Sequence, residues 1–482
     1  MPVRPDGRRR RTPTPWVVAL AVALVLGLVV LAAVDRPAGT RAGSVARPNI
    51  VLIITDDQRV DELAGMPNVR SLLIDHGITF SNYFATTPSC CPSRSSLLAG
   101  QYSHHTGVLD GTAAPPPGGA SAFHDTSTLA TWLRADGYRT GLVGKYLNQY
   151  GMLPAGYIPP GWNEWDAIAQ PIHEDDYYDY VLNENGKIVR YGDAPSDYST
   201  TVLADKAMTF IRTSAQPFFL YFAPVAPHVP ATPAPGDEAR VPAVAPILAP
   251  SYNQADVSAE PWGTRVPPLR SGRQRKADEV RMGMYRSLLA VDRAVGDMVG
   301  ALDALGELND TYILYTSDNG YLWGEHRIIG KLWPFEESIR VPLVVRVPGM
   351  DAPRTDPHLV LNIDMASTLT QLAGTRPGLP QDGRSFVPLL QGRSPPWRSA
   401  FVVEFLGSSS RLPPAFVALR TEQYMYVEFD NGWRDLYDVR ADPFELHNLA
   451  EDPSARPVVS ALATQLHTLF TAPARGTGQT AG

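Results

Sequence analysis

Long apolar runs along the chain predict buried β-strands. Residues 50–54 (IVLII) contain no polar side chain, and further strand-like runs lie at 140–144, 217–225, 311–320 and 341–349. A strand that is covered on both faces reads as an unbroken apolar run, whereas a half-exposed strand alternates. We therefore expect these segments to share one sheet that is buried on both sides.

The segments between these runs carry apolar residues at helical spacing. In MPNVRSLLIDHG, Val69 and Leu73 follow this spacing before the stop at Gly77, and residues 128–137 and 280–308 show longer helical patterns. Strands that alternate with helices are typical of α/β proteins. The pattern predicts a large, mostly parallel or mixed sheet sandwiched by helices.

The pattern changes near residue 390. Four short strand-like segments (AFVVEF, AFVALR, QYMYVEF, WRDLYDV) follow with little helix between them, and 457–470 then has helical spacing. We expect a large domain over 48–390, a small α+β subdomain over 391–470 with an antiparallel sheet and a helix, and a disordered tail over 471–482. The Pro- and Ala-rich segment 231–276 is expected to be a long surface excursion of the large domain.

The N-terminus has the character of an export signal. RRRR at 8–11 precedes the uncharged apolar run 16–34, and positive charge before such a run indicates export with the N-terminus inside. The run is long enough to span a bilayer and no clean small-x-small cleavage site follows, which favours an uncleaved anchor over a cleaved signal. We expect residues 1–47 to be tail, anchor or signal, and linker, with the folded part outside the cytoplasm.

Charge and cysteine content narrow the possible functions. The net charge of −7, without a long basic face beyond the N-terminus, argues against a nucleic-acid partner. The chain has two cysteines, Cys90 and Cys91, which are adjacent. Exported proteins form disulfides, but adjacent cysteines can be bridged only with strained geometry. Chemistry at one of the two sulfur atoms is therefore a better explanation than a structural bridge.

Cys90 is placed where a thiolate would be stabilised. Pro92 suits the first turn of a helix that runs through SRSSLLAG to Gly100, so Cys90 is expected immediately before the helix N-terminus. The helix dipole and Arg94, in the first turn, favour negative charge there. The pattern indicates an activated thiolate or a group made from one. The alternative, a buried inert thiol, is the expected fate of Cys91.

Hard oxygen ligands gather at two strand ends. Asp56 and Asp57 follow the run at 50–54, and Asp318 and Asn319 close the run at 311–320. Functional sites of α/β sheets lie beyond the carboxyl ends of the strands. Oxygen ligands suit Ca²⁺ or Mg²⁺ better than zinc. The alternative is that Asp-Asp and Asp-Asn-Gly are ordinary turn sequences.

Three cations also follow strand ends or the SDNG segment. They are Lys145, His228 and Lys331. Each alone would be read as a surface or loop residue, but together they could surround an anion that is held by a divalent metal.

These segments resemble the formylglycine-dependent sulfatase family of the alkaline-phosphatase-like superfamily. CCPSRSSLLAG is similar to the motif C-x-P-S-R-x-x-x-x-x-G, GYRTGLVGKYLNQYG to the second sulfatase motif, and LYDVRADPFELHNLA to the usual C-terminal segment. PNIVLIITDDQ and YTSDNGYLWGEHR look like the metal segments. The resemblance covers residues 48–450 and is closest to N-acetylglucosamine-6-sulfatases, which act on heparan or keratan sulfate. It implies that residues 48–390 are the catalytic domain.

The resemblance implies a role for each candidate residue. Cys90 would be oxidised to formylglycine by a separate formylglycine-generating enzyme, and Arg94 would stabilise its hydrate. One hydroxyl of the hydrate would attack sulfur, and the second would allow release of sulfate and return of the aldehyde. The implied ligands of one divalent cation, Ca²⁺ rather than Mg²⁺, are Asp56, Asp57, Cys90, Asp318 and Asn319. The groups that would bind sulfate or protonate the leaving oxygen are Lys145, His228 and Lys331.

One position departs from the family pattern. Many sulfatases have histidine two residues after the lysine, in G-K-x-H, whereas this chain has Leu147. Asn148 is a candidate to supply the polar contact instead, as in glucosamine-6-sulfatase-like members that read K-Y-L-N, and His326 is a second substrate-binding candidate by its proximity in sequence. Loops at 150–200 and 231–276 are expected to set specificity.

Two other functions stay open. The same fold hosts phosphodiester and phosphonate monoester hydrolases, and a catalytically dead, membrane-tethered glycan-binding protein would keep the fold without the chemistry. The residues leave the exact sulfated small molecule or glycan open, as they do the choice between Ca²⁺ and Mg²⁺.

Overall fold

The computed structural model describes residues 1–2, 47–113, 117–170, 176–240, 249–407 and 412–474. The apolar run at 16–34, predicted as an anchor or signal, and residues 475–482 of the predicted tail lie outside the described residues. Within the described ranges, no helix combines the length and the apolar character needed to cross a membrane. The main folded unit begins at Arg47.

The main sheet has ten strands, and its centre is parallel. β1 (Asn49–Thr55) lies between β9 (Thr311–Ser317) and β8 (Phe218–Ala223), and β4 (Arg139–Gly144) and β5 (Glu164–Ile168) follow β8 in the same direction. Beyond β9 lie β12 (Leu343–Arg346), β2 (Gly77–Phe80) and β13 (Arg354–Asp356), and beyond β5 lie β6 (Val181–Glu184) and β7 (Lys187–Arg190). β12 and β6 are antiparallel to their neighbours. The predicted large mixed sheet is confirmed.

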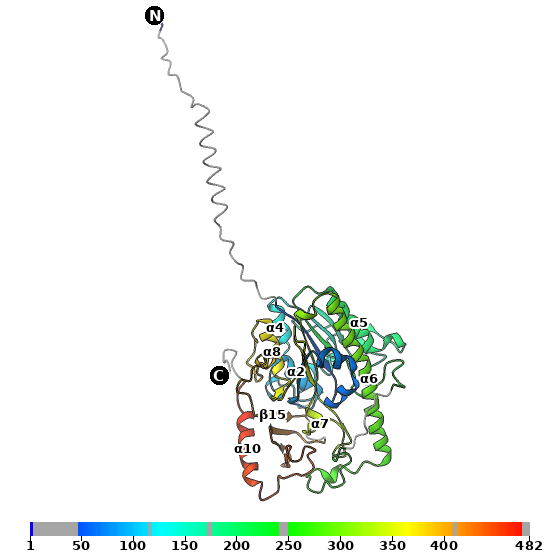
Figure 1. Ribbon diagram of the computed structural model, residues 1–482, viewed down its shortest axis with the longest axis vertical. Helices are drawn as coiled ribbons and strands as arrows, with labels where there is room; N and C mark the ends of the chain where they lie inside the picture. Colours follow the sequence, from blue (N-terminus) through cyan, green and yellow to red (C-terminus); the bar gives the residue numbers. More distant parts are fainter. Residues whose placement is uncertain (3–46, 114–116, 171–175, 241–248, 408–411, 475–482) are drawn as a thin grey trace. The chain divides into compact units, whose positions relative to one another are not determined.

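Helices cover both faces of this sheet (Figure 1). Along β1, Ile50, Leu52 and Ile54 face one core, and Val51 and Ile53 face the other. The first core is completed by α2 (Cys90–Ala99), α4 (Leu129–Ala135) and α8 (Asp364–Ala373), and the second by α5 (Ser199–Thr213) and α6 (Ser271–Ala304). Because successive side chains of a strand point to opposite faces, an unbroken apolar run supplies both cores.

A second, antiparallel sheet follows in the chain. It consists of β15 (Ala400–Phe405), β16 (Phe416–Thr421), β17 (Tyr424–Phe429) and β18 (Arg434–Asp438), in sequence order. α10 (Arg456–Phe470) packs on it through Leu462 and Leu466. The predicted small C-terminal sheet with a helix is therefore confirmed. Short elements complete the fold: β3 (Tyr83–Phe84), α3 (Ser103–Thr106), β10 (Leu322–Trp323), β11 (Ile329–Gly330), α7 (Glu336–Ile339), β14 (Val360–Leu361) and α9 (Val387–Leu390).

Two expectations about the connecting segments are wrong in part. Residues 150–200, expected to be a loop, contain β5, β6 and β7, which form one edge of the main sheet. The long helix α6 begins at Ser271, inside the segment expected to be a surface excursion, and not at residue 280. Its polar first turns, SGRQRKADE, hide the helical pattern because they lack an apolar stripe.

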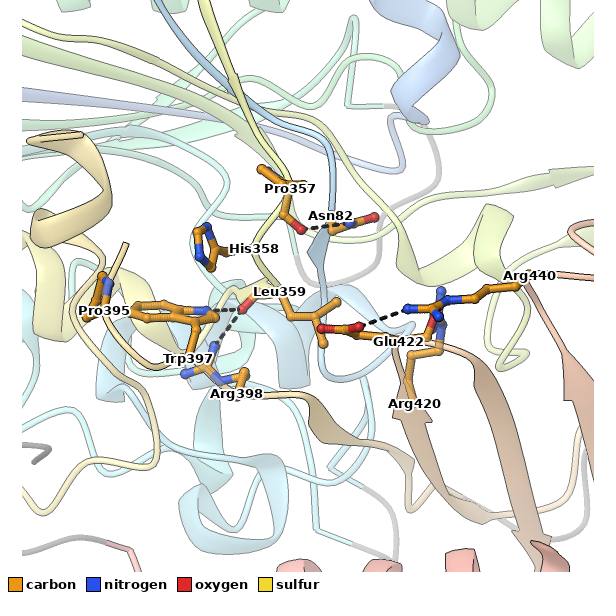
Figure 2. Close-up of a pocket in the computed structure, with 10 residues that line it drawn as sticks. All are labelled: Asn82, Pro357, His358, Leu359, Pro395, Trp397, Arg398, Arg420, Glu422 and Arg440. Carbon is orange, nitrogen blue, oxygen red and sulfur yellow. Dashed lines mark hydrogen bonds and ion pairs between the residues drawn. The ribbon is translucent and has the colours of Figure 1, made fainter. Parts of the chain in front are cut away.

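The cavity in Figure 2 lies between the two sheets and has a volume of about 570 Å³. Three arginines line it, but each is paired with a carboxylate: Arg398 with Asp364, Arg420 with Glu336 and Arg440 with Glu422. The residues that line the cavity include none of the predicted catalytic or metal-binding residues, so it is not the candidate catalytic site.

Two buried carboxyl groups join the excursion to the small sheet. Glu260 accepts a hydrogen bond from Tyr437 (Oη–Oε2 2.6 Å), and Asp435 accepts one from Asn448 (Nδ2–Oδ1 2.8 Å). Burial and then the charge of Asp435 raise the pKa of Glu260 to about 8, and burial raises the pKa of Asp435 to about 7. Near pH 5 both groups are therefore protonated in the folded protein.

We expect thermal stability to fall as the pH rises from about 5 to about 8. The unfolded chain releases these two protons near pH 4, whereas the folded chain keeps them to about pH 7 and 8, so folding becomes less favourable across this window. Asp435→Asn removes one of the two groups and should reduce this slope, while Glu451→Gln at an exposed position should not. Thermal melts at a series of pH values measure the effect. Equal slopes for wild type and Asp435→Asn would contradict it.

Candidate active site

The carboxyl ends of the central parallel strands bring the candidate residues together. Asp56 follows β1, Asp318 follows β9 and Lys145 follows β4. β9, β1, β8 and β4 are parallel neighbours, so their carboxyl ends lie at the same edge of the sheet. Asp57 has a left-handed backbone (φ 72°), which ends the alternation of the strand and lets both aspartates face this edge.

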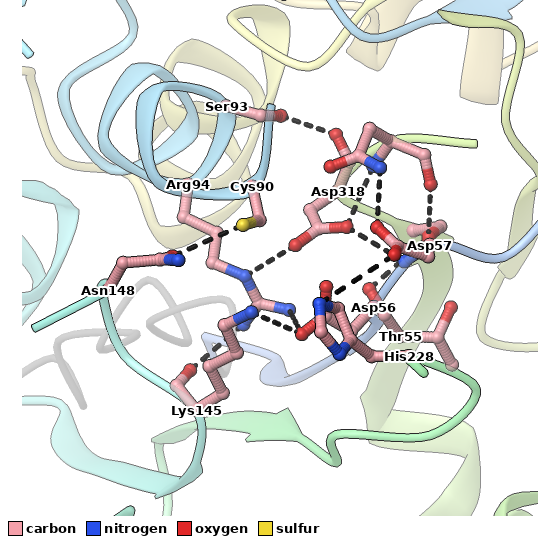
Figure 3. Close-up of polar contacts among 12 residues, drawn as sticks. Thr55, Asp56, Asp57, Cys90, Ser93, Arg94, Lys145, Asn148, His228 and Asp318 are labelled. Atoms are coloured by element: carbon pink, nitrogen blue, oxygen red, sulfur yellow. Dashed lines mark hydrogen bonds and ion pairs between the residues drawn. The ribbon is translucent and has the colours of Figure 1, made fainter. Parts of the chain in front are cut away.

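Each carboxylate in this group is paired with a cation, and Figure 3 shows the pairs of Asp318 and Asp56. Asp318 binds Arg94 (Oδ2–Nε 2.6 Å), Asp56 binds Lys145, and Asp57 binds Lys331. Asp56, Asp57, Asp318 and Arg94 are fully buried, and Lys145 is nearly so. The Arg94 guanidinium also donates to the Lys145 carbonyl (Nη1–O 2.9 Å). The result is a buried network of opposite charges at the end of the sheet.

Burial and pairing shift the pKa values of this network in opposite directions. Burial tends to raise the pKa of Asp56, but the charges of Lys145, His228 and Arg94 outweigh burial and hold it well below its usual value. Burial and the neighbouring Asp56 raise the pKa of Asp318 to about 6. Burial tends to lower the pKa of Lys145, but Asp56 and then Cys90 hold it above its usual value. Lys145 is therefore a permanent cation at this edge.

The unpaired oxygens of this group fit a divalent cation. Asp56 Oδ1, Asp57 Oδ2 and Asn319 Oδ1 are buried and accept no hydrogen bond from the described residues. Asn319 donates its amide to Asp57 (Nδ2–Oδ1 2.7 Å), which turns its own oxygen away from that carboxylate. Carboxylate and amide oxygens without donors are what a hard ion such as Ca²⁺ or Mg²⁺ requires. The predicted ligand set therefore suits such an ion.

Cys90 is the first residue of helix α2 rather than the residue before it. Ser89 is the N-cap, and Gly100 ends the helix with a left-handed backbone (φ 70°). Cys90 is 5% exposed, and its sulfur donates to the Asn148 side chain (Sγ–Oδ1 3.2 Å). Figure 3 shows this sulfur on the side of α2 that faces Arg94 and Asp318. The sulfur thus lies at a helix N-terminus next to the charged network.

Cys91 and Leu147 belong to the apolar core. Cys91 is completely buried, and burial raises the pKa of its thiol to about 12, so it stays protonated. Leu147, at the position where many sulfatases have histidine, is 1% exposed in the same core. The neighbouring Asn148, and not residue 147, contacts Cys90.

His228 faces the network through one ring nitrogen. Its Nδ1 is 2.6 Å from the Val229 carbonyl, so Nδ1 carries the proton in the neutral ring, and its Nε2 is 3.8 Å from Asp57 Oδ2. Burial lowers the pKa of His228 despite the nearby Asp56 and Asp57. A proton placed on Nε2 would therefore be given up readily.

His326 does not join this group. Its described contacts are with Phe335, on which its ring stacks at 3.7 Å, with Trp262, and with Gln254 (Nδ1–Oε1 3.1 Å). Its side chain is completely buried. The described contacts of the ring are with these residues and not with the charged network, and its contact with substrate stays a prediction.

Two positioning residues were missed by the sequence analysis. Ser93 donates to the Asp318 carbonyl (Oγ–O 2.6 Å), and Asn362 donates to Ser93 (Nδ2–Oγ 3.0 Å). Asn362 directly follows the short strand β14. A polar residue at a strand end is the feature of the sequence that could have identified it. Together they fasten α2 to the end of β9.

The comparisons with known proteins agree with this arrangement. Residues 48–375 match the sulfatase family, and residues 324–472 match the C-terminal region of N-sulphoglucosamine sulphohydrolase. N-acetylglucosamine-6-sulfatase of Homo sapiens is 33% identical over 508 residues, covering 94% of this chain and 89% of that protein. An extracellular sulfatase SULF-1 homolog of Drosophila melanogaster is 39% identical over 75% of this chain, which spans only 33% of that protein.

Two solved structures show the same fold. BT4656 in complex with D-glucosamine-2-N,6-O-disulfate has a TM-score of 0.72 at 24% identity and covers 87% of this chain and 97% of its own. The phosphonate monoester hydrolase of Agrobacterium radiobacter has the same TM-score and identity, covering 88% and 95%. The family match over most of the chain, the relatives and the fold agree. The chain belongs to the sulfatase family and is a sulfuric ester hydrolase.

Proposed function

We propose that this sulfatase removes the 6-O-sulfate of N-acetylglucosamine or of a related sulfated sugar. The observation that carries the proposal is the position of Cys90, at a helix N-terminus between Asn148 and the network of Arg94, Asp318 and Lys145. The choice of sugar is supported by the relatives named N-acetylglucosamine-6-sulfatase, which share 33–34% identity over most of this chain.

The proposed reaction needs a formylglycine made from Cys90 and one divalent cation, Ca²⁺ rather than Mg²⁺. The formylglycine hydrate supplies a hydroxyl nucleophile and a second hydroxyl through which sulfate is released, and the cation supplies positive charge to both groups. Asp56, Asp57, Asp318 and Asn319, together with residue 90, would hold the cation. A formylglycine-generating enzyme would be the partner for maturation.

The residues of the chain do the remaining work. Lys145 and Lys331 meet the negative charge of the sulfate group, and both are held as cations by carboxylates. Arg94 stabilises the ionised form of residue 90 at the helix N-terminus. His228 delivers a proton from Nε2 to the leaving sugar oxygen, because its Nδ1 is occupied by the Val229 carbonyl.

A panel of substrates and one mass spectrum test this function. We expect release of sulfate from N-acetylglucosamine 6-sulfate, less from 2-N- or 3-O-sulfated glucosamine, and faster turnover of an aryl sulfate than of an aryl phosphonate monoester. The peptide that contains Cys90 should carry the aldehyde. Faster phosphonate turnover would favour the hydrolase class of the second structural neighbour, and an unmodified thiol without activity would favour a glycan-binding protein.

We also propose that residues 48–390 form the catalytic domain, that 391–470 form a C-terminal subdomain, and that the enzyme acts outside the cytoplasm. The basic residues and apolar run at 8–34 support export, as do relatives named extracellular sulfatases. Fractionation of cells into membrane and secreted material would separate an anchored from a released form.

We expect Asn148→Ala to lower kcat roughly 10- to 100-fold, with a small change in KM. Asn148 contacts the reacting side chain, so its loss frees residue 90 to rotate without removing a charge that binds sulfate. Gln149→Ala is the matched control, because the Gln149 side chain accepts a hydrogen bond from the Ala113 backbone (Oε1–N 2.7 Å) rather than from residue 90. Equal rates for the two variants would contradict the role of Asn148.

A further inference from the structure

A second cluster of metal-ligating groups lies outside the proposed active site. It consists of His326, which follows β10, Glu337 in α7, and Glu445, which follows β18. One ligand atom from each residue lies within 4.8 Å of the others. His326 is 0% and Glu445 1% exposed. Glu445, more than 100 residues later in the chain, thus meets two residues of the segment 326–337.

The hydrogen bonds of His326 fix which ring nitrogen faces the cluster. Gln254 donates its amide to the Leu446 carbonyl (Nε2–O 3.2 Å), so its oxygen is the atom near His326. His326 Nδ1 therefore carries the proton and donates it to Gln254 (3.1 Å), and Nε2 is left as a lone pair. Nε2 has no hydrogen-bond partner among the described residues. Metal-binding histidines are held in the same way, because their second ring N–H donates to an acceptor such as this amide oxygen.

The two glutamates point unpaired oxygens into the same place. Glu445 Oε2 accepts the Glu336 backbone N–H (3.0 Å), but Glu445 Oε1 and Glu337 Oε2 have no hydrogen-bond partner in the part of the chain that the structure describes. Burial raises the pKa of both side chains, with a smaller contribution from Glu325 for Glu337 and from Glu336 and Glu337 for Glu445. These oxygens and the Nε2 lone pair are three buried acceptors that lack a donor between them.

The nearby arginines are engaged elsewhere. Arg420 binds Glu336 (Nε–Oε1 2.7 Å), and Arg59 binds Glu325 (Nη1–Oε1 2.8 Å). Neither forms an ion pair with Glu337 or Glu445 in the described structure. Arg59 acts on Glu337 and Arg420 acts on Glu445 only from beyond ion-pair distance. Buried acceptors that lack a donor are costly, and a metal ion or a shared proton between them would remove this cost.

We propose that His326, Glu337 and Glu445 bind a divalent transition-metal ion such as Zn²⁺ in a structural site. One imidazole nitrogen and two carboxylate oxygens suit Zn²⁺ or Mn²⁺, whereas the all-oxygen set around Asp57 suits Ca²⁺ or Mg²⁺. The ion ties the β10 segment and α7 to the chain after β18. It therefore fastens the small antiparallel sheet to the segment that carries Lys331.

Metal analysis and melting of the full-length protein test this site. Protein stripped with a chelator and given Zn²⁺ alone should regain one equivalent and melt at a higher temperature. Co²⁺ in its place should give visible absorption bands from a site with nitrogen and oxygen ligands. Both responses should persist in Asp57→Asn, which alters the proposed active-site ion, and both should be lost in Glu445→Gln. Glu422→Gln, in an exposed ion pair of the same sheet, is the control and should respond like wild type.

Three results would overturn the proposal. Stripped wild-type protein that takes up no Zn²⁺ or Co²⁺ outside the Asp57 site would show that a shared proton, and not a metal, lies between the carboxylates. Equal metal uptake by Glu445→Gln and wild type would place the ion elsewhere. If Glu445→Gln fails to fold, His326→Gln takes its place in the same measurements, and metal uptake by this variant equal to wild type would overturn the proposal too.

Discussion

Cys90→Ser is expected to lower kcat for sulfate-ester hydrolysis by at least about 10³-fold without unfolding the protein. Serine has the same shape, so helix α2 keeps its first residue and the contact with Asn148. A serine hydroxyl can accept a sulfate group but has no second hydroxyl through which to release it. The variant should therefore stop after one transfer, and mass spectrometry should find the peptide heavier by one sulfate group.

Cys91→Ala is the matched control for this prediction. Cys91 is completely buried, and its burial keeps the thiol protonated, so its replacement should affect packing but not the chemistry. We expect formylglycine at position 90 in this variant, with kcat within a few-fold of wild type. Multiple turnovers at the wild-type rate by Cys90→Ser would refute the proposed nucleophile.

Arg94→Ala is expected to destabilise the protein by about 3–5 kcal/mol and to abolish turnover. Arg94 is completely buried, and its guanidinium contacts Asp318 (Nε–Oδ2 2.6 Å), with Asp56 at 3.8 Å from Nη2. Removal leaves these buried carboxylates without a counterion that lies between them. Chemical unfolding gives the change in stability, and sulfate release gives the change in rate.

Two further variants separate charge from geometry. Arg94→Lys keeps one charge but cannot reach Asp318, Asp56 and the Lys145 carbonyl together, so its loss of stability should be intermediate. Arg139→Ala removes a partly exposed pair with Glu164 (3.2 Å) and should cost less than about 1 kcal/mol. A cost for Arg94→Ala as small as that for Arg139→Ala would show that the buried network does not depend on Arg94.

The apolar pattern was sufficient to find the central strands but not the arrangement of the edges. The run at 50–54 must be buried on both faces, whichever strands lie beside it, so β1 was predictable. The apolar pattern of β12 fits a parallel and an antiparallel strand equally well. Its antiparallel pairing with β9 depends on the path of the intervening chain. β5, β6 and β7 are short, and the sequence pattern predicts a loop there because their apolar residues lie among polar and turn-forming ones.

The candidate site was predictable where it depends on strand ends. Asp56, Asp318 and Lys145 had to meet, because their strands are parallel and end at one edge. Which lysine pairs with which aspartate depends on side-chain reach and could not be inferred from the order of segments. His326 shows the limit of proximity in sequence: it is close to Lys331 along the chain, but its backbone turn sends the ring toward Phe335.

The register of β1 has a consequence for the order of events during synthesis. Asn49 pairs with Thr311, its partner 262 residues later, so the centre of the sheet cannot close until most of the chain has been made. During that interval residue 90 lies on an open chain, whereas afterwards only 5% of it is exposed. If residue 90 is oxidised as proposed, the oxidising enzyme would have its best access before the last central strand is added. A shorter connection between β1 and β9 should let the sheet close sooner. A smaller fraction of the enzyme should then be modified at residue 90.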